Sequence, residues 1–201
     1  MNGFEKRKQQ KQEAIRKATL DLFNRYGPKD MNIVQIAKAA NVSQVTIYNH
    51  FQSKEQLIRE TIIDYLMKQL DVYKQLLLND YPFEQKIEML MFEKVKSTET
   101  INAVFLQKIL QEDLELARWF QQFYQKQSLP LVIEFITTAK TRGEISEEIS
   151  IETILFYVEA LKAQLNKIPL SQMNEFNQKR GKEILNVFFY GITGKKGNNN
   201  E

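Results

Sequence analysis

The sequence predicts an all-α protein in which a small N-terminal three-helix domain is followed by a larger helical domain. Apolar residues recur at intervals of three, four and seven, and strand-like alternation is absent. Only 7 Gly and 4 Pro interrupt the 201 residues, and 43% of them are hydrophobic, which is enough to bury a substantial core. We expect the domains at residues 8–68 and 69–192, and a disordered tail at 193–201.

Composition excludes several classes of protein. The chain has no Cys, which removes disulfides, zinc ribbons and thiol catalysis. No apolar run approaches the roughly 18 residues that span a bilayer, and the N-terminus lacks the apolar core of a signal peptide. We therefore expect a cytoplasmic protein with no membrane partner.

Positive charge is concentrated at the N-terminus. Residues 1–60 hold 11 Lys or Arg against 6 Asp or Glu, whereas the rest of the chain is slightly acidic. Residues 1–12 include Lys6, Arg7, Lys8 and Lys11, and we expect a flexible basic arm there that can approach a phosphate or a minor groove. A solvated helix start that touches nothing explains the same residues equally well.

The first helix has one apolar face, and we expect it to support the next two helices from behind. Its apolar residues are Ile15, Ala18, Leu22, Phe23 and Tyr26, and Gly27-Pro28 is a strong stop signal.

Residues 32–51 predict a helix-turn-helix. Asn32 caps a short amphipathic helix, Asn41 breaks it, and Ser43 caps a second short helix. Two short helices joined by so tight a turn are typical of this motif. Val42, Ile47 and Phe51 define a buried face of the second helix.

The opposite face of that helix carries residue types that suit DNA. Gln and Asn can pair bidentately with adenine, an apolar group can touch a thymine methyl, and Thr, Tyr, His and Lys can donate to phosphates. An ordinary amphipathic helix with a solvated polar face is the alternative, which the preceding helix makes less favourable. The candidate DNA-binding residues are Asn32, Ser43, Gln44, Val45, Thr46, Tyr48, Asn49, His50 and Lys54.

The run from Ile15 to about Ile62 resembles the tetracycline-repressor (TetR) family of bacterial transcription regulators. The similarity is closest at Ile36-Ala37, Ala40, Val42-Ser43, Thr46-Ile47-Tyr48, His50-Phe51 and Ser53-Lys54-Glu55-Gln56-Leu57. The resemblance implies that Thr46, Tyr48, His50 and Lys54 hold the DNA backbone, which leaves base reading to Gln44, Val45 and Asn49. This sequence departs from the family at Asn41, where Gly is usual, and at Val45, where a smaller residue or Pro is common.

The remaining chain predicts helices alone. Ser53 caps a helix with Gln56 in a capping-box-like arrangement, and this helix continues to about Leu78 as the link between the domains. Pro130 implies either a kink or two helices within its segment. The further candidates are 83–97, 99–111, 114–142, 151–167 and 172–190.

The last two candidate helices have large apolar stripes, at Ile151, Ile154, Leu155, Val158, Leu161 and Leu165, and at Phe176, Ile184, Leu185, Phe188, Phe189 and Ile192. With Ser171 as a cap they should form an antiparallel hairpin. The resemblance implies that this hairpin meets its copy in a homodimer, which would present two recognition helices to a palindromic operator. An internal core hairpin has the same periodicity.

The resemblance also implies a small-molecule ligand whose binding releases DNA. An apolar cavity could be lined by Phe92, Phe105, Trp119, Phe120, Phe123, Tyr124, Phe135, Phe156 and Tyr157. The same set could be plain core. Glu134 could meet a cationic ligand or lie on an outer face, and no ligand residue is assigned.

Two other functions are less consistent with the sequence. An enzyme is disfavoured, because the sole His lies in the expected recognition helix and no phosphate loop or metal-spaced ligand set is present. No cofactor or metal is therefore expected. The alternative is a helical adaptor that binds another protein and carries a vestigial DNA-binding module. The sequence favours a DNA-binding transcription regulator, more readily a repressor than an activator.

Overall fold

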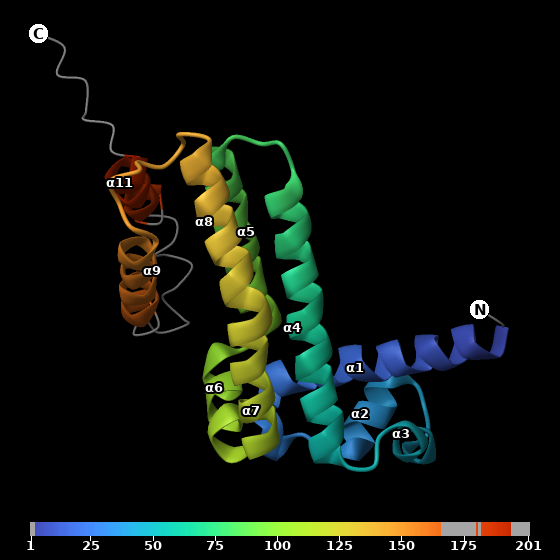
Figure 1. Ribbon diagram of the computed structural model, residues 1–201. Helices are drawn as coiled ribbons and strands as arrows, with labels where there is room; N and C mark the ends of the chain where they lie inside the picture. Colours follow the sequence, from blue (N-terminus) through green and yellow to red (C-terminus); the bar gives the residue numbers. More distant parts are fainter. Residues whose placement is uncertain (1–2, 166–179, 181, 194–201) are drawn as a thin grey trace, which may run out of the picture. The chain divides into compact units, whose positions relative to one another are not determined.

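The structure is a computed structural model that describes residues 3–165, 180 and 182–193. These described residues form helices and contain no strand (Figure 1). The helices are α1 (Gly3–Asp30), α2 (Ile33–Ala40), α3 (Gln44–His50), α4 (Lys54–Leu78), α5 (Phe83–Thr100), α6 (Ala103–Glu112), α7 (Leu114–Phe123), the π-helical turn η1 (Tyr124–Ser128), α8 (Leu129–Thr141), α9 (Ile151–Leu165) and α11 (Lys182–Thr193). Among the described helices, none is both long enough and apolar enough to cross a membrane.

The chain divides into two compact units. Among the described residues, the first unit contains residues 3–78 and 90–124, and the second contains residues 79–89, 125–165, 180 and 182–193. The predicted division at residues 68 and 69 differs from this one, because it falls inside α4, which belongs to the first unit down to Leu78.

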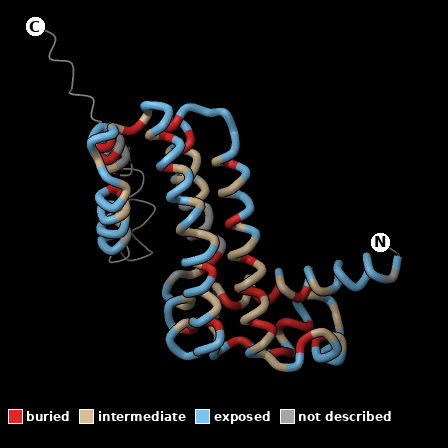
Figure 2. The backbone as a smooth tube through the Cα atoms, viewed as in Figure 1, coloured by how far each residue is buried: buried red, intermediate tan, exposed pale blue. Residues whose placement is uncertain are grey.

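The helix-turn-helix contributes to the core of the first unit. In it α1 packs against α2, α4 and α6, and α2 packs against α3. Figure 2 shows the buried residues gathered where these helices cross. The fully buried side chains include Ile15, Ile36, Ile47, Leu57 and Leu116. Because Leu116 comes from α7, residues far along the chain complete the core behind the helix-turn-helix.

The predicted stop at Gly27 is confirmed by the backbone. Gly27 interrupts α1 with φ 76° and ψ 172°, and one further turn leads to Asp30. A Cβ on Gly27 would lie 3.0 Å from the ring of Phe105 in α6. The position therefore needs Gly for its positive φ and for the close approach of the ring.

The predicted flexible arm at residues 1–12 is instead helical from Gly3 onward. The residues between Lys6 and Gln12 include neither Gly nor Pro, so α1 can extend through several exposed turns beyond its buried part.

Two helix boundaries differ from the prediction. The break expected at residues 97–98 occurs at residues 101–102, because the Asn102 side chain caps α6 by accepting from the N–H groups of Val104 and Phe105. The segment 114–142 consists of α7 and α8 with η1 between them, which resolves the two possibilities at Pro130. Pro130 lies in the first turn of α8, where its missing N–H is not needed.

The second unit has its own apolar core. Its buried side chains are Phe83, Ile136, Ala139, Ile145, Ile154, Phe188 and Ile192. Phe83 stacks on Phe135 with ring centroids 5.1 Å apart, and Tyr157 stacks on Phe188 at 5.7 Å. The predicted cap Ser171, the loop around it and the tail from residue 194 lie outside the described residues.

Candidate nucleic-acid interface

The start of α2 is fixed by a complete capping box. The Asn32 side-chain oxygen accepts from the Gln35 backbone N–H at 3.0 Å, and the Gln35 side chain accepts from the Asn32 N–H at 2.9 Å. Asn32 is exposed, so the amide nitrogen of its side chain stays available to a phosphate.

The turn between α2 and α3 depends on Asn41. Its backbone is left-handed, with φ 53° and ψ 48°, and the Val42 N–H donates to the Ala37 carbonyl at 3.0 Å. Asn adopts this conformation more readily than most residues, which explains how this sequence forms the turn without Gly.

The start of α3 is fixed by Ser43, whose Oγ accepts from the Thr46 backbone N–H at 3.0 Å. The Ser43 and Thr46 hydroxyls lie 2.8 Å apart and share a hydrogen bond. One of the two hydroxyls donates its single proton in this bond, so only the other can donate to a phosphate oxygen at the same time.

Burial determines which side chains of α3 point outward. Ile47 is fully buried and Phe51 is 1% exposed, as predicted. Val45 and Tyr48 are 67% and 53% exposed, and Gln44 and Asn49 are exposed as well. The structure therefore presents the predicted base-reading residues on one outward surface, while Thr46 and His50 are half-buried at its edges.

His50 has an unusual environment at the end of α3. Its Nδ1 atom is buried and has no hydrogen-bond partner in the structure. Burial lowers the pKa of this imidazole below its ordinary value, and the positive charges of Lys8 and Lys11 on α1 lower it further. His50 is therefore neutral near pH 7, with one free ring nitrogen on the inner side.

Lys54 has a structural task that the sequence did not indicate. Its Nζ donates to the carbonyl oxygens of Pro28 and Met31, at 3.1 and 3.2 Å. The ammonium has a third proton that can meet a phosphate. Lys54 thus joins the end of α1 to the start of α4 beside the predicted interface.

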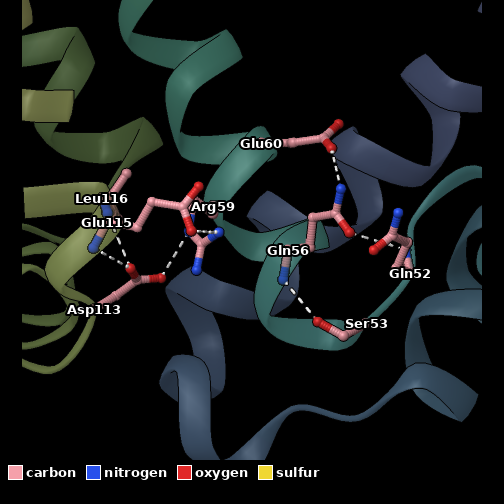
Figure 3. A network of polar contacts seen from close by, with 8 residues as sticks. All are labelled: Gln52, Ser53, Gln56, Arg59, Glu60, Asp113, Glu115 and Leu116. Carbon is pink, nitrogen blue, oxygen red and sulfur yellow. Dashed lines mark hydrogen bonds and ion pairs between the residues drawn. The ribbon is translucent and has the colours of Figure 1, made fainter.

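A polar network supports α4 (Figure 3). The Gln56 backbone N–H donates to Ser53 Oγ, as predicted, and the Gln56 side chain accepts from the Gln52 N–H and donates to Glu60. In the same view, Arg59 reaches Asp113 at 3.0 Å and also pairs with Glu115.

Asp113 caps α7 as well as pairing with Arg59. Its carboxylate accepts from the N–H groups of Glu115 and Leu116 at 3.0 and 2.9 Å. Although burial acts in the opposite direction, the hydrogen bonds from Leu116 and Arg59 lower the pKa of this carboxyl. The Arg59–Asp113 pair was not predictable from the sequence, because residues 54 positions apart give no local signal. The only local signal is an Asp directly before Leu114, which is a residue type that caps helices.

The predicted ligand-lining aromatic residues are distributed over both units. Phe105 packs edge to face on Phe23, and Trp119 stacks on Phe123 at 4.9 Å, all within the first unit. Phe135 and Tyr157 pack in the second unit. These contacts are those of core packing, the alternative that the sequence left open.

The other aromatic residues of the predicted ligand-lining set have different environments. Phe156 is 76% exposed, Phe120 and Tyr124 are half-buried, and the side chain of Phe92 lies outside the described residues. Glu134 is exposed, so it lies on an outer face of its unit. Within the described part of the chain, no group of three His, Cys, Asp or Glu side chains could hold a metal ion.

Two short capped helices with a mostly polar outward face, packed on α1 and on the core of the first unit, form a helix-turn-helix of the kind found in DNA-binding proteins. Residues 15–61 match the family model of bacterial regulatory proteins, tetR family. This N-terminal part of the chain is therefore similar to the DNA-binding domain of TetR-family regulators. No curated protein sequence matches it.

Solved structures share its fold. GusR of Salmonella enterica has a TM-score of 0.70 and 18% identity, over 92% of this chain and 95% of its own. The fatty acid degradation regulator FadR of Bacillus halodurans has a TM-score of 0.68 and 19% identity, over 90% and 98%. FadR of Bacillus subtilis, solved with stearoyl-CoA, has a TM-score of 0.65 and 17% identity, over 90% and 98%.

Proposed function

We propose that this protein is a cytoplasmic, homodimeric repressor that binds a palindromic operator and leaves it when a small-molecule ligand binds. The observation that carries the proposal is the outward face of α3. Gln44, Val45 and Asn49 stand exposed on a helix whose start, end and buried face are all fixed by local contacts. A preordered face of this kind can read base edges without a cost for ordering itself.

Backbone contacts are assigned to the residues around that face. Tyr48 and the Asn32 amide are exposed, while His50, Lys54 and one of the Ser43 and Thr46 hydroxyls retain a donor for a phosphate. These contacts would fix the register of α3 in the major groove but would not distinguish sequences.

The dimer is supported by apolar side chains of the second unit. Phe156 on α9 and Val187 and Tyr190 on α11 are 76%, 64% and 60% exposed. Exposed apolar groups on neighbouring turns favour association with a second copy. Two recognition helices roughly 34 to 36 Å apart would then meet successive major grooves on one side of the duplex.

A ligand is supported by the likeness in fold to the stearoyl-CoA complex of Bacillus subtilis FadR. A long-chain acyl-CoA is therefore the first compound to test. A ligand that binds one dimer shape better than the other would shift the population away from the shape that fits DNA.

The test is selection of bound sequences from a random duplex pool by the full-length protein at two salt concentrations. We expect a palindrome with half-sites about one helical turn apart. Stearoyl-CoA is then titrated against that complex, and release identifies the ligand class. Absence of any enriched sequence would contradict the proposal and favour the adaptor, because nonspecific attraction weakens with salt for every sequence alike.

Gln44→Ala and Asn49→Ala should each cost roughly 1 to 3 kcal/mol on the selected operator and little on random DNA. Tyr48→Phe should weaken both complexes equally, which makes it the matched control. Equal losses on both kinds of DNA for all three variants would overturn the assignment of contacts.

A further inference from the structure

The N-terminal turns of α1 continue the buried stripe of the helix with cationic side chains. Ile15 and Ala18 are buried against the helix-turn-helix. Lys11 and Lys8 stand four and seven positions before Ile15, so at 100° per residue they share its face. Both are exposed. The stripe therefore changes from apolar to cationic where α1 leaves the core.

This cationic stretch lies beside the end of the recognition helix. In Figure 1 the first turns of α1 extend beyond its crossing with α4, on the side where α2 and α3 lie. The charges of Lys8 and Lys11 act on the His50 imidazole at the end of α3. The two lysines on α1 are therefore within electrostatic range of the last residue of α3.

Two acidic residues lie near this stretch, and only Glu5, three positions before Lys8, is a neighbour of these lysines on the helix surface. Glu13 lies on the opposite face of α1 and pairs with Lys68 of α4 at 2.6 Å. Among the described residues, neither Lys8 nor Lys11 takes part in an ion pair. The two ammonium groups are therefore exposed to solvent without an ion-pair partner, and they add to the positive charge of the N-terminal part of the chain.

We propose that the N-terminal turns of α1 form a second, rigid DNA-backbone contact, in which Lys8 and Lys11 bind phosphates flanking the groove read by α3. The inference rests on the proposed DNA binding and extends it to an element that touches no base. Because these turns are helical before DNA arrives, binding avoids the ordering cost that a disordered arm would carry.

The helix supplies its own matched control. Lys6 and Lys17 lie about 180° from Ile15 around α1, on the face opposite to Lys8 and Lys11, and both are exposed. Lys8→Gln with Lys11→Gln and Lys6→Gln with Lys17→Gln make the same change in net charge. Gln and Lys have similar helix propensities, so both doubles should keep α1. Circular dichroism would verify this in the full-length proteins.

The experiment measures affinity for the selected operator and for random DNA across a range of salt concentrations. The Lys8/Lys11 double variant should lower the slope of log affinity against log salt by about 0.9 for each phosphate that the protein no longer binds, on both kinds of DNA. Lys8→Arg with Lys11→Arg should keep the slope. The Lys6/Lys17 double variant should change it much less.

Equal slopes for the two Gln doubles would overturn the proposal, because only long-range charge would then matter. The proposed function is tested separately, since the Gln44 and Asn49 variants alter discrimination between sequences and not the salt slope. An unchanged salt slope in the Lys8/Lys11 double variant, with discrimination intact, would therefore reject the α1 proposal alone.

Discussion

The backbone of Asn41 is left-handed, and Asn tolerates this conformation better than most residues do. Asn41→Ala should lower the free energy of unfolding by about 1 kcal/mol, because Cβ meets the following carbonyl and Ala lacks the compensating amide. Asn41→Gly should stay within about 0.5 kcal/mol of the original protein, since Gly avoids that strain but gains unfolded-state entropy. Urea unfolding checks both. An unaffected Ala variant would mean that this turn carries no conformational strain.

His50 should make stability depend on pH. Its pKa is lowered in the folded protein by burial and by Lys8 and Lys11, so below the ordinary value of 6.5 the unfolded chain binds the proton more readily. The stability conferred by the neutral imidazole is present above that pH and is lost as the pH falls toward the lowered pKa. His50→Gln should reduce the decline in Tm between about pH 7 and pH 5. Identical declines in both proteins would contradict this.

Among the elements, α4 and α7 are joined by Arg59 and Asp113. The two side chains are 22% and 14% exposed, so solvent screens this pair less than a surface pair. A double-mutant cycle with Arg59→Met and Asp113→Asn should give a coupling of roughly 1 kcal/mol. Asp113→Ala should cost about 1 kcal/mol more than Asp113→Asn, because it also removes the cap of α7.

The pH dependence of that coupling has a definite sign. The Asp113 pKa is lowered in the fold, so the contribution is complete above the ordinary value of 3.8 and is lost as the pH falls through the lowered pKa. Cycles measured at neutral pH and well below pH 3.8 should therefore differ. An unchanged coupling in acid would show that charge does not carry it.

The elements that the sequence predicted well are those fixed by neighbours along the chain. Asn32, Ser43 and Gln56 act within a few residues, and the structure has α2, α3 and α4 where these residues placed them. The start of α6 was misplaced because Asn102 caps more strongly than Ser97-Thr98 breaks. Capping and breaking preferences alone do not decide which of two possible boundaries in one segment is used, because the surrounding packing also contributes.

The exposed face of α3 was predictable for the same reason, but its surroundings were not. Exposure of Gln44 and Val45 follows from the helical period and the burial of Ile47. The hydrogen bonds from Lys54 to Pro28 and Met31, and the effect of Lys8 on His50, depend on how α1 crosses α2 and α4. The periodicity of apolar residues identifies the buried face of a helix, but it does not determine how that helix crosses its neighbours.

For the whole molecule, the proposed association of two copies would link the recognition helices. Phe156→Glu places a charge on a strongly exposed apolar side chain of α9 and should shift the protein from dimer to monomer in sedimentation equilibrium. Binding to a complete palindrome should weaken, while binding to one half-site should change little.

Val104→Glu is the control, since Val104 is 60% exposed on α6 and belongs to the first unit. It should remain a dimer. If Phe156→Glu also remains dimeric at the lowest concentration measured, α9 does not contribute to the interface.

The Trp119–Phe123 stack gives the protein a built-in optical reporter. Trp119 is the single tryptophan of the sequence, and it packs at the edge of the core that contains Ile15, Ile47 and Leu116. Its emission therefore comes from one known place, without a label. A blue or red shift on adding a compound would register a change around α7 directly, and the same signal would follow unfolding of the core beneath the DNA-binding helices.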